Sequence, residues 1–308
     1  MDRPPGQIAG EPPRGALAGD NPRLGIALMI VTSAIFAAQD GVSRHLAAHY
    51  SVMTVVMLRF WFLAGFVVVV AAARGGGVMR VARTRQPWLQ AFRGVLLVFE
   101  ICVTVLSFVV LGLIETHAIF AIYPLLVAAL AGPVLGEYVG WRRATAIAVG
   151  LAGVLVILRP GVRVFSVEAL IPFVAALMFA LYGLLTRLAA RQDSAETSFF
   201  WTGVVGAAAI TCVAPFWWTP IRGAADMGWM ALLCVGATAG HFLLIKAYEV
   251  AEAGVVQPFA YFQLVFVAVI AVTLFGERLD PWTMAGAGLI LAAGLYTLGR
   301  EARTARRR

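Results

Sequence analysis

The chain has 308 residues, of which 61% are hydrophobic and only 13% are charged, and its mean hydropathy is +0.87. A soluble domain carries about 25% charged residues, so this composition excludes a water-soluble globule. It predicts an all-α integral membrane protein that has the lipid bilayer as its surroundings. The net charge of +8 follows from membrane topology, as argued below, and does not indicate nucleic acid as a partner.

The first 23 residues are rich in Pro and Gly and contain no apolar stretch. Residues 1–23 therefore predict a flexible cytoplasmic leader rather than a signal peptide. Ten apolar segments follow, each close to the roughly 17–25 residues that a helix needs to cross a bilayer. We expect spanning helices over residues 24–46, 51–73, 88–111, 115–135, 141–158, 168–189, 197–216, 228–248, 254–275 and 281–299.

The basic residues predict the orientation of these ten helices. With a cytoplasmic N-terminus, all but six of the 24 lysines and arginines lie on or near the cytoplasmic side. The positive-inside rule therefore places both termini, including the basic tail 300–308, in the cytoplasm of an inner-membrane protein. The six exceptions are Arg44, Arg59, Arg159, Arg163, Arg222 and Arg278.

Two similar stretches close apolar runs in the two halves of the chain. They read VLGEYVGW at Val134–Trp141 and LFGERLDPW at Leu274–Trp282. Each marks the end of a helix, where its glutamate either lies in a hydrated turn near the headgroups or takes part in gating. The shared pairs are Gly136-Glu137 and Gly276-Glu277.

A second alignment extends this similarity to a repeat. The stretch FAAQDGVSRHLA at Phe36–Ala47 matches FALYGLLTRLAA at Phe179–Ala190 with nearly the same offset. We therefore predict two five-helix repeats, residues 24–160 and 161–299. Because five is odd, the second repeat must enter the membrane from the opposite side, which is the inverted repeat of secondary transporters.

This arrangement resembles the drug/metabolite transporter superfamily and, within it, the EamA-type ten-helix exporters. The matching features are the two halves, the Gly-Glu pair that closes the fourth helix of each, and a Gly-rich last helix in each (Ala146–Leu158 and Ala285–Leu298). Pro124 in the middle of the fourth helix also fits, but its aligned position in the second half is Leu264, and Pro258 comes earlier. The resemblance implies small-molecule transport, and the amino-acid exporters, including those for aromatic amino acids, are the most similar branch.

The resemblance also implies where the substrate binds. In this family the central cavity is lined by helices one, three, four, six, eight and nine, and apolar walls with a few polar groups are usual for such sites. Each Tyr or Gln among the implied residues could instead form an interhelical hydrogen bond. The implied cavity residues are Phe36, Gln39, Asp40, Glu100, Tyr123, Phe179, Tyr182, His241, Gln257, Phe259, Tyr261 and Gln263.

Charged side chains inside spanning helices cost about 2.5–3.5 kcal/mol each, so we expect them to pair or to function. Asp40 and Arg44 are four residues apart on one helix face and predict a local ion pair; substrate contact by Asp40 is the alternative. Arg59, in the middle of the second span, predicts a buried ion pair with Glu100 in the third. Arg93 lies nearer the cytoplasmic side and is expected to reach the headgroups.

Several kinds of chemistry have no motif in this sequence. There is no Gly-x-x-x-x-Gly-Lys-[Ser/Thr] phosphate loop, so we expect no ATP as a partner. Cys102, Cys212 and Cys234 lack the spacing of disulfides or metal sites, and neither a metal nor a cofactor is predicted. The stretch GVSR (Gly41–Arg44) is a weak match to an intramembrane serine protease, which leaves an intramembrane enzyme as a remote alternative.

The sequence thus predicts a non-enzymatic secondary transporter that exports amino acids or related small metabolites by alternating access through a central cavity. The alternatives within the same superfamily are an uptake carrier and a drug efflux pump. Transport is either facilitated or coupled to protons, with Asp40, Glu100 and His241 as titratable candidates. The oligomeric state stays open.

Overall fold

The structure is a computed structural model that describes residues 21–73, 77–135, 141–158, 167–251 and 253–305. All regular structure in these residues is helical. The elements are α1 (Pro22–Ala47), α2 (Val52–Ala73), α3 (Gly77–Ala82), α4 (Pro87–Phe120), α5 (Tyr123–Leu135), α6 (Trp141–Leu158), α7 (Val167–Ala189), α8 (Ala195–Val213), η1 (Ala214–Trp217), α9 (Ala224–Val250), α10 (Ala253–Val256), η2 (Gln257–Tyr261), α11 (Phe262–Phe275) and α12 (Pro281–Ala305).

Six helical segments of the described chain are long and apolar enough to cross a membrane. This confirms a multi-pass membrane protein. The six are α1, α2, α4, Glu168–Ala189 in α7, Ala195–Trp217 and α9, and the shorter apolar helices are Tyr123–Leu135, Phe259–Phe275 and Pro281–Ala293.

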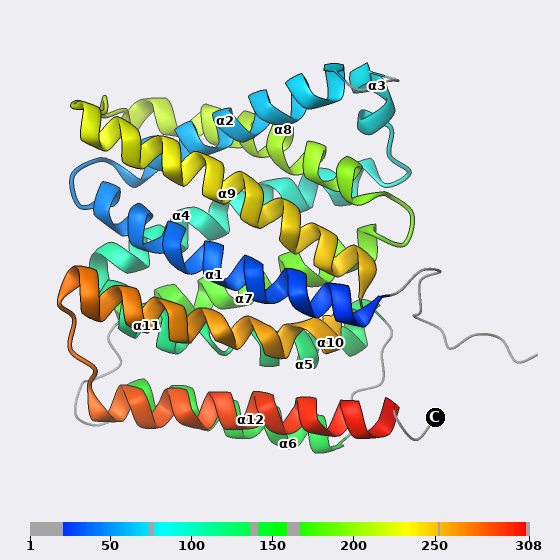
Figure 1. Ribbon diagram of the computed structural model, residues 1–308, viewed down its shortest axis with the longest axis vertical. Coiled ribbons are helices and arrows are strands. Elements are labelled where there is room, and N and C mark those ends of the chain that lie inside the picture. Colours follow the sequence, from blue (N-terminus) through cyan, green and yellow to red (C-terminus); the bar gives the residue numbers. More distant parts are fainter. Residues whose placement is uncertain (1–20, 74–76, 136–140, 159–166, 252, 306–308) are drawn as a thin grey trace, which may run out of the picture.

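The long helices run side by side along one direction, and α1 begins at the same end of the bundle at which α12 ends (Figure 1). We call this the near end and the opposite one the far end. Helices α2 and α8 pack together along one edge, and α6 packs against α12 along the other. Between these edges, α1 packs most extensively against α9, and α4 against α7.

Helix α4 combines the predicted third span with the first part of the predicted fourth. The chain turns at Gly112, whose φ of 83° and ψ of 177° are not helical and which L-residues with a side chain rarely adopt. The fourth span is then interrupted again before α5, so Pro124 lies near the start of a helix and not in the middle of one, which corrects the prediction. Proline disfavours helical backbone in the residue before it, and Pro258 lies likewise in the 3-10 segment η2 ahead of α11.

Arg93 does not reach the headgroups as expected, because its side chain is completely buried inside the bundle. One terminal nitrogen donates to Tyr182 Oη (3.3 Å) and Thr186 Oγ1 (3.0 Å). The other donates to Gln90 Oε1 (2.8 Å) and to the carbonyl of Ser198 (2.7 Å). A single guanidinium thus joins α4, α7 and α8, because its donors are held in a planar fork that can reach several acceptors at once.

Close approach of α1 and α9 depends on Gly240. A Cβ atom at Gly240 would lie 2.6 Å from Phe36 Cε1, whereas one at Gly236, a turn earlier on α9, would meet nothing within 4 Å. We expect Gly240→Ala to destabilise the protein by about 1–3 kcal/mol through overpacking. Gly236→Ala should be neutral or stabilising, because alanine favours helix over glycine. Thermal unfolding of the two variants in detergent tests this, and equal midpoints would contradict it.

Candidate functional site

A polar cavity lies inside the bundle, between helices of both halves of the chain. Its volume is about 40 Å³, whereas sites for drug-sized ligands have roughly 300–1,000 Å³. In this conformation it has room for water but not for a metabolite. Its lining residues are Phe36, Gln39 and Asp40 of α1, Arg59 of α2, Glu100, Ile101, Thr104, Val105, His117 and Phe120 of α4, Phe179 of α7, His241 of α9 and Gln263 of α11.

Asp40 is the centre of the first polar cluster in the cavity. One of its carboxylate oxygens, Oδ2, lies 3.0 Å from Nε2 of His117 and also accepts a hydrogen bond from Nε2 of Gln263 at 3.0 Å. The other ring nitrogen of His117 lies 3.0 Å from the carbonyl oxygen of Leu113. The predicted local pair of Asp40 with Arg44 is therefore absent from the described structure. The partners of Asp40 instead come from α4 and α11.

Arg59 forms the second polar cluster, with His241. Its guanidinium lies 2.9 Å from Nε2 of His241, and because arginine can only donate, Nε2 is the acceptor and Nδ1 carries the hydrogen. This Nδ1 is buried and has no hydrogen-bond partner in the described part of the chain, and the same is true of Gln39 Oε1. Buried polar atoms normally have partners, so two residues that line the cavity carry one unused donor and one unused acceptor.

Glu100 lines the same cavity as Arg59. Its carboxylate accepts a hydrogen bond from Thr104, one turn further along α4, at 2.6 Å. Among the described residues, Arg59 is hydrogen-bonded to His241 and Glu100 to Thr104, rather than to each other. Their direct ion pair stays a hypothesis, and the two charges do share one buried space.

Aromatic rings form one wall of the site. Phe179 lies at the middle of this wall, with ring centroids 5.0 Å from Tyr123, 5.5 Å from Phe120 and 6.4 Å from Phe36. The ring of Phe36 also lies 5.1 Å from that of His241. Such edge-to-face and tilted contacts are favourable for aromatic pairs, and a flat ring could replace one of them.

Glu277 closes the far end of the bundle. Its two carboxylate oxygens accept hydrogen bonds from the backbone nitrogens of Leu113 (3.0 Å) and Ile114 (2.9 Å). These N–H groups start a helical stretch after the turn at Gly112, where the preceding carbonyls are out of reach and a carboxylate is favoured. Arg44 of α1 contacts the same carboxylate. The glutamate of the Gly-Glu pair in the second half of the chain therefore links α1 and α4.

Other contacts hold the near end together. The backbone nitrogen of Asn21, just before α1, donates to the carbonyl of Val250 at 2.6 Å. Arg187 of α7 donates to the carbonyl of Tyr248 at 3.0 Å. The cavity thus lies between two sets of interhelical contacts.

The predicted site residues fall into three groups. Tyr123 and Tyr261 line a smaller adjoining cavity of about 10 Å³, Tyr182 is buried beside Phe179 and His241, and Phe259 packs against the core. The side chain of Gln257 and the marker pair Gly136-Glu137 lie outside what the structure describes. Those that line the central cavity are Phe36, Gln39, Asp40, Glu100, Phe179, His241 and Gln263.

The prediction of cavity residues named Arg59 only as an ion-pair residue, and it missed Ile101, Thr104, Val105, His117 and Phe120. Thr104 follows Glu100 by four residues and so lies on the same helix face. His117 and Phe120 continue with Tyr123 at a spacing of three. These spacings were the available signal, but the breaks near Gly112 and before α5 make a simple helical extrapolation unreliable.

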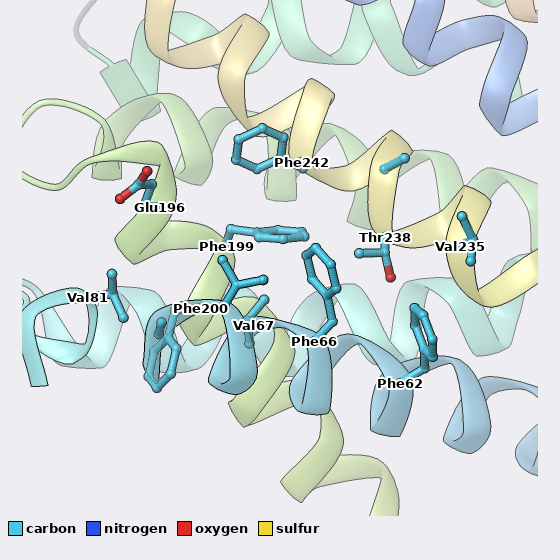
Figure 2. A pocket seen from close by; sticks show the side chains of 13 residues that line it. Phe62, Phe66, Val67, Val81, Glu196, Phe199, Phe200, Val235, Thr238 and Phe242 are labelled. Carbon is cyan, nitrogen blue, oxygen red and sulfur yellow. The ribbon is translucent and has the colours of Figure 1, made fainter. Parts of the chain in front are cut away.

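A larger cavity of about 340 Å³ lies between α2, α8 and α9. Figure 2 shows that phenylalanine rings from all three helices surround it. Apolar groups dominate it, and it lacks the convergent polar atoms that fix a metabolite, so the smaller polar cavity is the better candidate site. Its labelled lining residues are Phe62, Phe66, Val67, Val81, Glu196, Phe199, Phe200, Val235, Thr238 and Phe242.

Sequence comparison decides the family. Residues 23–159 and 167–299 each match the EamA-like transporter family. The chain belongs to this family. The two matches in this EamA-like transporter cover nearly the whole described bundle, and the helices that line the central cavity come from both.

Named relatives of this EamA-like transporter move small metabolites. It is 27% identical over 278 residues to an S-adenosylmethionine uptake transporter of Rickettsia prowazekii, covering 89% of this chain and 91% of that one. It is 28% identical over 237 residues to a riboflavin transporter of Rhizobium johnstonii, covering 73% and 74%. A solved crystal structure has a similar fold, with a TM-score of 0.64 at 16% identity over 91% of this chain and 97% of the other.

Proposed function

We propose that this EamA-like transporter is a secondary carrier that moves a small, ring-bearing zwitterion across the inner membrane by alternating access. The substrate site is the polar cavity around Asp40, Arg59 and Glu100. The observation that carries this proposal is the buried combination of both charges, unused hydrogen-bonding atoms and an aromatic wall in one cavity.

The packing of helices supports two inverted five-helix repeats. In the proposed repeat, α1 corresponds to α7, α9 to the first part of α4, and α11 to α5. The contact of α1 with α9 then corresponds to that of α7 with α4, and the contact of α1 with α11 to that of α7 with α5; all four are extensive. Two equivalent halves can exchange roles, so one arrangement opens to each side.

The chemistry of the cavity favours a zwitterion with a flat ring. Arg59 can attract a carboxylate, Asp40 or Glu100 can attract an ammonium or sulfonium, and Phe179 with its neighbours can stack on a ring. Aromatic amino acids and S-adenosylmethionine combine these groups. Riboflavin has the ring but no charge pair, so we expect it to be a poorer substrate here.

The direction of net transport follows the gradients of all the species that the carrier moves, because the sequence has no phosphate-loop motif for ATP. Amino-acid export and metabolite uptake therefore require different gradients across the membrane and not different binding sites. The relatives named as S-adenosylmethionine uptake transporters favour uptake. With both termini in the cytoplasm, the near end faces inward and the far end outward.

Counterflow in proteoliposomes tests the function. Vesicles loaded with unlabelled L-tryptophan, S-adenosylmethionine or riboflavin should accumulate the same labelled solute, fastest for one of the two zwitterions, and the solute should leave chemically unchanged. Val105→Trp fills the cavity, whereas Leu106→Trp, the next residue on α4, faces outward with 44% exposure. We expect only the first to abolish counterflow per folded protein. Absence of counterflow for the whole panel, or a chemically altered solute, would contradict a carrier.

A further inference from the structure

The hydrogen bonds of His117 determine how many protons its pair with Asp40 holds. A carbonyl oxygen can only accept, so the bond to Leu113 requires a hydrogen on Nδ1 of His117. The opposite nitrogen, Nε2, then faces the carboxylate of Asp40 at 3.0 Å. Without a further proton both of these atoms would be acceptors, and the contact would be repulsive.

One proton must therefore lie between Asp40 and His117 in this conformation. It resides either on the ring, giving an imidazolium beside a carboxylate, or on the carboxyl group beside a neutral ring. Both forms carry one proton more than a neutral histidine beside an ionised aspartate. Gln263 donates to the same carboxylate oxygen and supplies no proton of its own.

The pair of Asp40 and His117 is largely shielded from solvent. The side chains of Asp40 and His117 are only 11% and 5% exposed. The other ionisable groups that line the cavity are Arg59 of α2, Glu100 of α4 and His241 of α9. Arg59 and Glu100 carry opposite charges on the cavity wall, and Nε2 of His241 accepts a hydrogen bond from Arg59.

The same residues connect this proton to the closure of the far end. Asp40 lies one helical turn before Arg44 on α1. Nδ1 of His117 donates to the carbonyl of Leu113. The backbone nitrogen of Leu113 donates to Glu277, which also contacts Arg44. Two neighbouring contacts thus hold α1 against the second part of α4, and one of them needs the proton.

We propose that Asp40 and His117 form a proton-binding site that couples proton release to opening of the far end. When the pair releases its proton to the solution at the far end, an ionised Asp40 and a neutral His117 remain. Their facing acceptors repel, α1 moves away from α4, and the contact of Arg44 with Glu277 separates. Proton return reverses these steps. The proposal rests on the carrier function above and adds a proton as a second transported species.

A distance measurement tests the coupling without a substrate. Spin labels at Ala48→Cys and Val110→Cys, both exposed, mark α1 and α4 near the far end in a background without Cys102, Cys212 and Cys234. Pulsed electron–electron double resonance in nanodiscs should show mainly short distances between the two labels at pH 5.5. At pH 8.5 a larger share of the label pairs should be far apart. We expect Asp40→Asn, whose amide can donate to His117, to keep the short distances at both pH values.

Two further variants keep this test decisive. His117→Gln should also remove the pH response, because its amide donates to Asp40 without a titrating proton. His45→Gln is the matched control: His45 pairs with Asp226 at 3.7 Å on the same side of the bundle, and its loss should leave the pH response of the labels intact. An unchanged distance distribution in the parent, or a response that follows His45, would overturn the proposal.

Proton flux separates this proposal from the carrier function. In vesicles containing a pH dye, a gradient of whichever zwitterion shows counterflow should drive proton movement, and Asp40→Asn should reduce it by about tenfold or more. Counterflow without proton movement in the parent protein would contradict the proton site and would still be consistent with a carrier. Absence of counterflow for the whole solute panel would contradict the carrier function itself.

Discussion

Replacing Arg59 with leucine is expected to lower counterflow of a zwitterionic substrate by about a hundredfold or more, the equivalent of roughly 3 kcal/mol. The variant removes the cation that faces the substrate carboxylate and leaves Glu100 in the buried cavity without a compensating charge. It also removes the bond that fixes the tautomer of His241. Initial counterflow rates per folded protein measure the effect.

Variants with graded changes identify the cause of this loss. Arg59→Lys keeps the charge but not the planar fork and should retain more activity than Arg59→Leu. Arg278→Gln, at an exposed position, is the control and should be unchanged. A double-mutant cycle with Glu100→Gln should be non-additive, because the second change removes one uncompensated charge. Additive losses would show that the two charges act independently and would contradict their proposed pairing.

Replacing Arg93 with leucine is expected to give the largest loss of stability, about 3–5 kcal/mol. The change removes four hydrogen bonds and leaves buried acceptors on Gln90 and Ser198 without this donor. It also removes the hydrogen bonds by which this side chain links α4 to α7 and α8. Thermal unfolding in detergent measures the loss, with ligand-free protein for every variant.

The control for Arg93 is Arg83→Gln, an exposed position on the segment after α3. Exposed substitutions usually change stability by less than about 0.5 kcal/mol. Similar unfolding midpoints for the two variants would mean that the buried guanidinium contributes no more than a surface charge. A lower midpoint for Arg93→Leu with unaltered counterflow in the folded fraction would confirm a structural role separate from transport.

The overall class of the protein could be predicted from sequence because hydropathy and the internal similarity of the two halves are patterns along the chain that do not depend on tertiary contacts. Long apolar runs can only satisfy their backbone groups in a bilayer as helices, and most predicted spans agree with the observed helices to within a few residues. Family membership follows from the same pattern, and seven of the predicted cavity residues do line the polar cavity. The exceptions arise at Gly112, whose backbone is not helical, and just before Pro124, where the helix is interrupted between α4 and α5.

What the sequence by itself determined is therefore the helical membrane architecture, the family and the helices that carry polar side chains. What only the tertiary structure decided is the partner of each buried charge. Asp40 and Arg44 satisfy a local spacing rule, yet they bind His117 and Glu277, and Arg93 points into the bundle and not to the headgroups. A buried charge takes partners that satisfy its hydrogen-bonding capacity. For Asp40 and Arg93 these include partners on other helices, whose rotation and breaks no local spacing reveals. Glu100, in contrast, accepts its hydrogen bond from Thr104 on its own helix.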